Sequence, residues 1–135
     1  MYTYSTRVNF YDADGAGILF FGNIFRIIHS AYEDFINKGN FSRNYFSDEQ
    51  YAIPIIHTGA DYIKPIFPNS NIVVKVSLQE VKTSSFIFLY EIYDEKDELL
   101  ARCTTVHVFV EKMKWNKTNI PQEVRDHLNL HLIKN

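Results

Sequence analysis

Two aspartates in a glycine-containing turn are the residues of this sequence best suited to chemistry. Asp12 and Asp14 stand directly before the apolar run at residues 18–21, which leads into an amphipathic segment. An isolated pair of this kind would be interpreted as a helix cap. Here the apolar run would enclose a carboxylate in a low-dielectric pocket beside the free N–H groups of a helix start. Such a pocket suits the stabilisation of an oxyanion.

Other catalytic and metal-binding motifs are missing from the sequence. Phe20 occupies the position of the third glycine of a dinucleotide fingerprint, and no Walker A or Gly-x-Ser-x-Gly motif is present. His127 and His131 have the i, i+4 spacing of a metal-binding pair, but no third ligand stands near them. We therefore expect no metal site.

Three side chains in the expected strands are of reactive types, but each could instead have a purely structural role. Cys103 is expected to be a buried and inert thiol. His57 and His107 are expected in the middle of strands, where packing is the more frequent role and substrate contact is the alternative.

The composition is that of a folded protein with little net charge. Of 135 residues, 46% are hydrophobic and 22% are charged, and the formal net charge is −2. This balance gives no electrostatic footprint for nucleic acid, and the apolar runs are far shorter than the about 20 residues of a membrane helix. The N-terminal residues lack the pattern of a signal peptide. We therefore expect one cytoplasmic domain over residues 1–135, with no nucleic-acid or membrane partner.

Hydrophobic periodicity predicts the elements that position the aspartates. Period-two alternation predicts a strand over residues 3–11, and helical spacing predicts a buried helix over residues 23–38 that stops at Gly39. Four β-rich segments follow, at residues 53–64, 71–81, 85–93 and 99–111. Their short connections indicate antiparallel strands, and Pro121 is expected to begin a short C-terminal helix bearing Val124, Leu128 and Leu132. The order β-α-β-β-β-β predicts an α+β fold, in which a curved five-stranded sheet wraps one long central helix.

The segment around the aspartates resembles a known family signature. Residues 11–23, YDADGAGILFFGN, resemble the D-x-D-x-x-G-h-h-a-a-x-N signature (h, hydrophobic; a, aromatic) of 4-hydroxybenzoyl-CoA-type thioesterases. Further similar segments stand at residues 52–57, 61–65, 85–86 and 100–107, so the resemblance covers residues 4–111. It implies the hot-dog fold. Within the family, three segments look most like the hydrolases of 1,4-dihydroxy-2-naphthoyl-CoA in menaquinone and phylloquinone biosynthesis: the Asp-Gly-Ala-Gly turn at residues 14–17, and residues 29–33 and 53–57.

The resemblance implies roles for individual residues. Asp14, the second aspartate of the signature, would act as base or nucleophile, and the backbone N–H of Phe21 would polarise the thioester carbonyl. We expect three aromatic residues, Phe20, Phe25 and Tyr62, to line the acyl pocket. The remaining candidate substrate-binding residues, which include the expected CoA-phosphate ligands, are His57, Lys64, Lys82, Ser84, Ser85 and Arg102.

The implied activity is hydrolysis of an aromatic acyl-CoA to the free acid and CoA. CoA is part of the substrate, so no cofactor is expected. A thiol with a pKa of about 8.5 leaves without a strong general acid, so a sparse site suffices. The alternatives are hydrolysis of an aliphatic acyl-CoA or acyl carrier protein thioester, and a non-catalytic module that binds acyl-CoA.

The sheet edges predict a homo-oligomer. A five-stranded sheet around one helix leaves exposed edges, and natural proteins seldom leave long apolar edges unpaired. The resemblance implies that two subunits join their sheets edge to edge with the active site between them, and that two such dimers pair into a tetramer.

Overall fold

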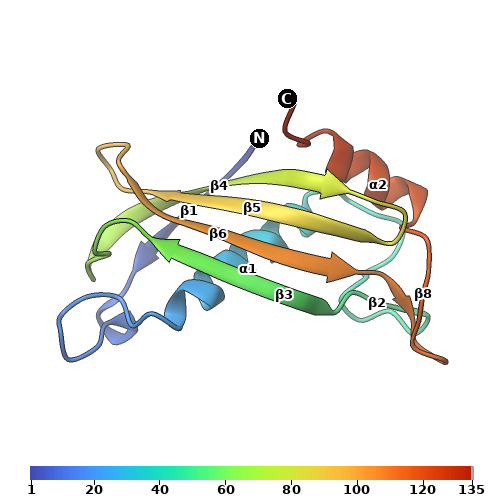
Figure 1. Cartoon of the computed structure of the whole chain (residues 1–135), viewed down its shortest axis with the longest axis horizontal. Coiled ribbons are helices and arrows are strands. Elements are labelled where there is room, and N and C mark those ends of the chain that lie inside the picture. Colours follow the sequence, from blue (N-terminus) through green and yellow to red (C-terminus); the bar gives the residue numbers. More distant parts are fainter. Residues whose placement is uncertain (135) are drawn as a thin grey trace.

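A curved antiparallel sheet packed around a long helix dominates the computed structural model, which describes residues 1–134 (Figure 1). The strand order is β1-β4-β5-β6-β3, and every neighbouring pair is antiparallel. The strands are β1 (Tyr2–Val8), β3 (Ile55–Tyr62), β4 (Ser70–Val81), β5 (Ser85–Tyr93) and β6 (Leu99–Val108). The predicted hot-dog arrangement is confirmed.

The central helix, α1 (Asn23–Asn37), is buried along the face that its sequence predicts. Ile24, Ile28 and Phe35 are almost completely buried against the sheet. The predicted glycine stop is wrong in one detail: the left-handed residue after the helix is Asn40, with a φ of 51°, and not Gly39. Asparagine tolerates this conformation better than most residues. Gly39 is needed for a different reason, because the ring of Phe41 packs against its α-carbon.

The first strand is shorter than predicted, because a side chain competes for the backbone. β1 ends at Val8, and a 3₁₀ turn, η1 (Phe10–Asp12), replaces the expected last residues of the strand. The carboxylate of Asp12 accepts the N–H of Asn9 at 2.9 Å, and the Asp12 N–H donates to the Asn9 carbonyl at 3.0 Å. These two bonds close a turn and end the strand.

A second, small sheet was not predicted. It consists of β2 (Tyr51–Ala52), β7 (Val110–Glu111) and β8 (Asn116–Lys117), in the order β2-β7-β8. The expected strand over residues 99–111 is interrupted at Phe109, whose N–H donates to the Ser84 carbonyl. Burial of Val108, Phe109 and Val110 in succession breaks the alternation at this point.

The C-terminal helix packs on the far end of β4. α2 (Gln122–Asn129) follows Pro121 as predicted, with Val124 and Leu128 buried. The placement of Leu132 on this helix is wrong, because Leu132 lies beyond its end and bridges Leu78 of β4. The tail thus pairs with β4 just beyond the point where Tyr2, the first residue of β1, pairs with Val76.

The edge strands of the large sheet are β1 and β3, and among residues 1–134 neither has a partner strand on its outer side. Within the same residues, no helix is both long enough and apolar enough to span a membrane.

Candidate active site

The two aspartates of the turn lie in opposite environments. Asp12 is 1% exposed and its carboxylate is fully engaged. Its Oδ1 accepts a hydrogen bond from Arg26 Nη2 at 2.6 Å, and its Oδ2 accepts the Asn9 N–H at 2.9 Å. Its carbonyl accepts the Phe20 N–H and the Asn23 side-chain amide, both at 2.9 Å. Asp12 therefore ties the turn to the first turn of α1.

Asp14 is exposed and only partly engaged. Its Oδ1 accepts the N–H of Ala16 at 2.8 Å, and its own N–H donates to the Ile18 carbonyl at 2.9 Å. Gly17 has a φ of 80° in the tight loop between them, a conformation that other residues rarely adopt. Asp14 Oδ2 has no hydrogen-bond partner within residues 1–134. The turn thus orients the carboxylate and leaves one oxygen available.

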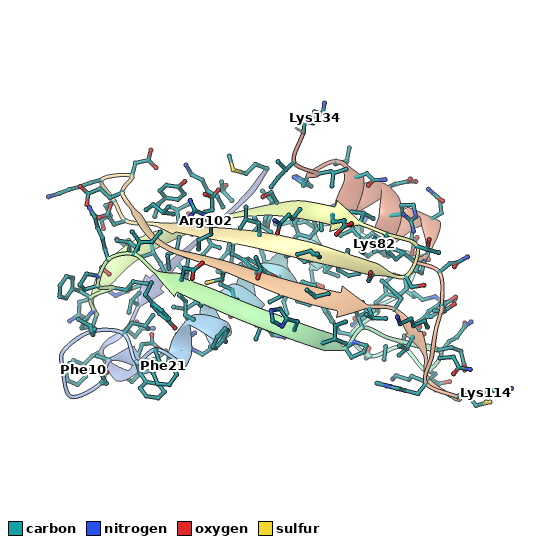
Figure 2. All side chains as sticks on the ribbon, viewed as in Figure 1. Phe10, Phe21, Lys82, Arg102, Lys114 and Lys134 are labelled. Carbon is teal, nitrogen blue, oxygen red and sulfur yellow. The ribbon has the colours of Figure 1, made fainter. Side chains whose placement is uncertain are left out.

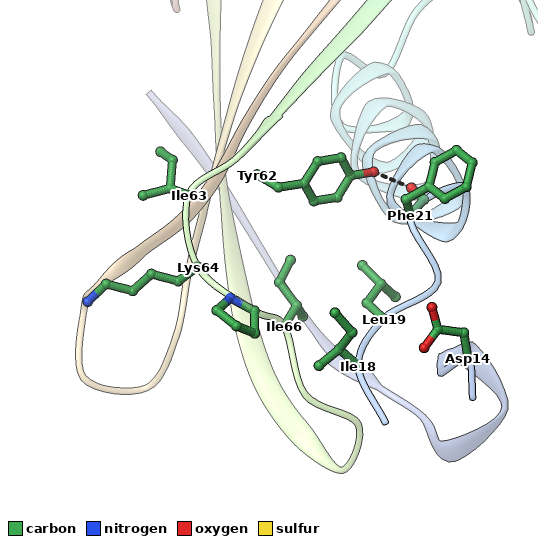
Figure 3. Close-up of a pocket in the computed structure, with 9 residues that line it drawn as sticks. Asp14, Ile18, Leu19, Phe21, Tyr62, Ile63, Lys64 and Ile66 are labelled. Atoms are coloured by element: carbon green, nitrogen blue, oxygen red, sulfur yellow. Dashed lines mark hydrogen bonds between the residues drawn. The ribbon is translucent and has the colours of Figure 1, made fainter. Parts of the chain in front are cut away.

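Asp14 borders a pocket of about 320 Å³ with mainly apolar walls. Figure 3 shows the two walls, one formed by the chain from Asp14 to Phe21 and the other by the chain that leaves β3 at Tyr62. The Leu19 N–H holds them together by donating to the Ile66 carbonyl at 2.7 Å. The lining residues are Asp14, Ile18, Leu19, Phe21, Tyr62, Ile63, Lys64, Pro65 and Ile66.

A backbone donor without an acceptor lies in the same pocket wall. Phe20 and Asn23 donate their N–H groups to the carbonyls of Asp12 and Phe20, whereas the N–H of Phe21 finds no acceptor among residues 1–134. Phe21 lies one residue before Gly22, the N-cap of α1, and is therefore close to the first N–H groups of the helix, which carry the positive end of the helix dipole. This N–H can therefore bind an oxyanion or a polarised carbonyl.

Tyr62 and Lys64 supply the polar groups of the opposite wall. The hydroxyl of Tyr62 donates to the carbonyl of Phe21, so the phenol bridges β3 and the start of α1 (Figure 3). Burial raises the pKa of Tyr62, which keeps this donor protonated. Lys64 Nζ lies 2.9 Å from Glu98 Oε2, and this hydrogen bond raises the pKa of Lys64.

The structure brings together only part of the predicted site. Asp14, Phe21 and Tyr62 line one pocket, and Lys64 joins them. Phe20 is not in the lining, although its ring packs on the Phe21 ring with centroids 4.8 Å apart.

Two further predicted residues lie elsewhere. Phe25 lines a separate cavity between α1 and the sheet. His57 is exposed on β3. His107, by contrast, is completely buried in β6, which favours its packing interpretation.

The candidate ligands for CoA phosphates are not gathered within one chain. Lys82 and Ser84 lie in the turn between β4 and β5, and Ser85 begins β5. Figure 2 shows Lys82 at the opposite end of the sheet from Phe21. Arg102 lies on β6, with Nη2 3.6 Å from Glu91 Oε2. Within a single chain, these residues and Asp14 do not form one site.

Sequence reasoning missed the apolar wall formed by residues 63–66. Its only signal in the sequence is Pro65, which was expected to bound a strand over residues 53–64, whereas β3 already ends at Tyr62. The pairing of Ile66 with Leu19 joins segments that are distant in the chain, so no local pattern predicts it.

No cluster of three potential metal ligands occurs in the described part of the chain. His127 Nε2 instead lies 2.9 Å from the carbonyl of Phe35.

Comparisons with known proteins show which family the chain resembles over most of its length. A family model described as thioesterase-like superfamily matches residues 8–128. The chain is 30% identical to a 1,4-dihydroxy-2-naphthoyl-CoA hydrolase from Synechocystis, over 90% of this chain and 89% of that protein. It is 27% identical to the enzyme of the same name from Nostoc punctiforme, over 91% of this chain and 83% of that protein. A crystal structure of a 1,4-dihydroxy-2-naphthoyl-CoA thioesterase from Synechocystis superimposes with a TM-score of 0.87 at 29% identity, covering 94% of each chain.

Proposed function

The chain belongs to the thioesterase-like superfamily, and from this membership we propose that it hydrolyses an aromatic acyl-CoA to the free acid and CoA. The relatives described above indicate 1,4-dihydroxy-2-naphthoyl-CoA as the substrate. The observation that carries the proposal is the pairing of two groups in one apolar pocket: the Asp14 carboxylate with an available oxygen, and the Phe21 N–H without an acceptor.

The proposed mechanism uses both groups on the thioester carbonyl. The Phe21 N–H donates to the carbonyl oxygen and stabilises the negative charge that develops there, which supplies about 3 kcal/mol of transition-state stabilisation. The available oxygen of Asp14 either attacks the carbonyl carbon or takes a proton from the attacking water. CoA then leaves as the thiolate, and the pKa of about 8.5 of its thiol makes a strong general acid unnecessary. If water attacks, the free acid forms directly. If Asp14 attacks, the acyl group remains on its carboxylate as an anhydride, which a water molecule then hydrolyses to release the free acid and restore Asp14.

The proposal includes a dimer that forms through β3. The outer edge of this strand is unpaired within residues 1–134, and the edge carries exposed Ile55, Ile56 and Tyr62. Antiparallel pairing of two copies of β3 places the Lys82 end of one sheet at the same end of the joined sheet as Asp14 of the other. Residues that one chain keeps apart would then share one cleft, and dimers would pair into tetramers. A stable and active monomer in sedimentation at micromolar concentration would refute this assembly.

A cytoplasmic location is part of the same proposal. The single cysteine, Cys103, is a free and buried thiol, which fits a reducing compartment.

The test of the function is Asp14→Asn, assayed by release of the CoA thiol. This change keeps the size of the side chain and removes both the base and the nucleophile. We expect kcat to fall by about two to four orders of magnitude with little change in KM, because the acyl group and CoA are held by other residues. The matched control is Asp12→Asn, for which kcat should stay within about tenfold, a barrier change of at most about 1.4 kcal/mol.

The substrates for this assay separate the alternatives. 1,4-dihydroxy-2-naphthoyl-CoA, benzoyl-CoA and palmitoyl-CoA are compared side by side. Preferred turnover of palmitoyl-CoA would assign an aliphatic substrate, and binding of all three without turnover would make the chain a binding module. Near-full turnover by Asp14→Asn would contradict the mechanism whatever the substrate.

A further inference from the structure

A second cavity, of about 270 Å³, lies between α1 and the concave face of the sheet. Its walls are mostly apolar, with hydroxyl groups contributed by strands β3, β5 and β6. The lining residues are Phe25, Ile28, His29, Ile55, Thr58, Tyr90 and Thr105. The hydroxyl of Thr58 is already engaged by the Thr104 carbonyl at 3.1 Å. The remaining polar side chains of the lining are His29, whose Nε2 lies 3.6 Å from Glu33 Oε1, and the hydroxyl-bearing Tyr90 and Thr105.

These two hydroxyls belong to a buried hydrogen-bonded chain. The Tyr90 hydroxyl lies 3.0 Å from Thr105 Oγ1, which in turn lies 2.8 Å from His107 Nε2. His107 Nδ1 is buried and has no partner within residues 1–134. The imidazole is stacked on Phe86, with centroids 5.1 Å apart, and lies 4.4 Å from the Tyr32 ring. This burial lowers the pKa of His107 to about 3, so the ring is neutral.

The three side chains Tyr90, Thr105 and His107 together have one more hydrogen-bond donor than the bonds between them require. A neutral imidazole carries one N–H, and the two hydroxyls carry one O–H each, so three protons serve two hydrogen bonds. If the imidazole proton is on Nδ1, the spare donor is an N–H sealed among aromatic rings, which is costly. If the proton is on Nε2, it binds Thr105, and the spare donor is a hydroxyl of Tyr90 or Thr105, which both line the cavity. The second arrangement is favoured.

The cavity lies within reach of a thioester held at Phe21. Phe25 is in the first turn of α1, and Ile28 and His29 are in the second. With a rise of 1.5 Å per residue, residues 25–29 lie about 3–9 Å along the helix from its first residue, Asn23, which follows Phe21 by two residues. An aromatic acyl group that runs along α1 from the Phe21 N–H would place its far side there.

We propose that this cavity binds a ring hydroxyl of a hydroxylated aromatic acyl group, whose oxygen accepts a hydrogen bond from the Tyr90–Thr105 pair. The inference rests on the proposed thioesterase function and makes these two residues specificity-determining. An acyl group without an oxygen at this position leaves the spare donor unpaired, and it is therefore bound less well in the transition state.

The test compares two esters that differ by one hydroxyl, 1,4-dihydroxy-2-naphthoyl-CoA and 1-hydroxy-2-naphthoyl-CoA. The wild-type protein should prefer the dihydroxy ester by about tenfold or more in kcat/KM. The double variant Tyr90→Phe/Thr105→Val removes both donors and should abolish this preference, with the monohydroxy ester changing by less than about threefold. Thr105→Ser keeps the hydroxyl and should keep the preference.

Tyr32→Phe is the matched control, because it removes a buried hydroxyl that does not line this cavity. It should leave the preference unchanged, and thermal unfolding of each variant shows whether it is folded. Equal loss on both esters in the double variant would overturn the inference, since it indicates damage to packing. Wild-type protein that hydrolyses both esters equally would also overturn it, even if the double variant does not fold, while leaving the proposed function intact. Hydrolysis of neither ester would refute the proposed function itself.

Discussion

Replacing Asp12 by asparagine should destabilise the protein by about 3 kcal/mol while leaving its chemistry in place. The Asp12 carboxylate is 1% exposed and accepts two hydrogen bonds, from Arg26 Nη2 at 2.6 Å and from the Asn9 N–H at 2.9 Å. An asparagine side chain offers only one oxygen. One of the two donors would therefore face the amide NH₂ group in a buried position, and the negative charge would be lost.

The magnitude follows from these two contacts. A hydrogen bond to a charged group contributes about 1.5–3 kcal/mol, and a buried donor left unpaired costs about 1–3 kcal/mol. The Arg26 side chain is 49% exposed, so its share is reduced by solvent screening to about 1 kcal/mol. A loss of about 2 kcal/mol at the Asn9 N–H and of about 1 kcal/mol at Arg26 gives a total destabilisation of about 3 kcal/mol. With an unfolding entropy of about 2.1 cal/mol/K per residue, this corresponds to a decrease in Tm of about 10 °C for a chain of this length.

The assay is urea and thermal unfolding followed by circular dichroism. Arg26→Gln is the control: it leaves the carboxylate bound to the Asn9 N–H and should cost only about 1 kcal/mol. If Asp12→Asn unfolds within about 0.5 kcal/mol of the wild type, or if Arg26→Gln costs more than Asp12→Asn, the reasoning is refuted. If kcat of Asp12→Asn falls as far as that of Asp14→Asn, the division of roles between the two aspartates is wrong.

Two other predictions concern the core and the acyl pocket. Since the His107 pKa is about 3 when folded and about 6.5 when unfolded, lowering the pH from 7 to 5 should cost about 2 kcal/mol of stability. His107→Gln should remove that dependence in urea unfolding at the two pH values, and an unchanged pH dependence would contradict the assignment. Phe20→Ala should raise KM for an aromatic ester more than for a short aliphatic one, since its ring packs on Phe21. Equal increases would indicate a packing role.

Elements with one continuously buried face were predictable from the sequence. In β4, Ile72, Val74, Val76 and Leu78 alternate with Val73, Lys75 and Ser77, and all four are buried. The helix was predicted over residues 23–38 and spans Asn23–Asn37. In both cases the spacing of the hydrophobic residues is the same as the spacing of side chains on one face of the element. The pattern therefore identifies the type of element and its inward face.

The errors occur where a specific contact overrides the pattern. The alternation in residues 3–11 continues past Val8, but the Asp12 carboxylate closes a turn there. The strands β2, β7 and β8 have two residues each, which is too short for any period to appear. No local rule predicts a contact whose partner lies elsewhere in the chain.

In the site, too, local sequence patterns predict neighbouring residues but not contacts between segments that are distant in the chain. Asp14 and Phe21 are seven residues apart and lie in one turn and the helix start that follows it, so a local signature predicts them together. The wall formed by residues 63–66 meets this turn only through the Leu19–Ile66 hydrogen bond. Lys82 and Arg102 do not line this pocket. In the proposed dimer their contribution would depend on how two copies of the chain associate, which no pattern within one chain specifies.

The turn shows how one short segment provides both a structural and a reactive carboxylate. Asp12 and Asp14 are chemically identical and two residues apart, and the difference between them lies in the donors that surround each. The oxygens of Asp12 are occupied by Arg26 and the Asn9 N–H, which stabilises the fold and leaves no oxygen for a substrate. One oxygen of Asp14 is occupied by the Ala16 N–H, which fixes its direction, while the other is available within residues 1–134. A carboxylate whose oxygens were both occupied would be well placed but unreactive, and one without any bond would be reactive but badly placed. The proposed chemistry therefore depends on the half-engaged state of Asp14, which its own bonds to Ala16 and Ile18 maintain.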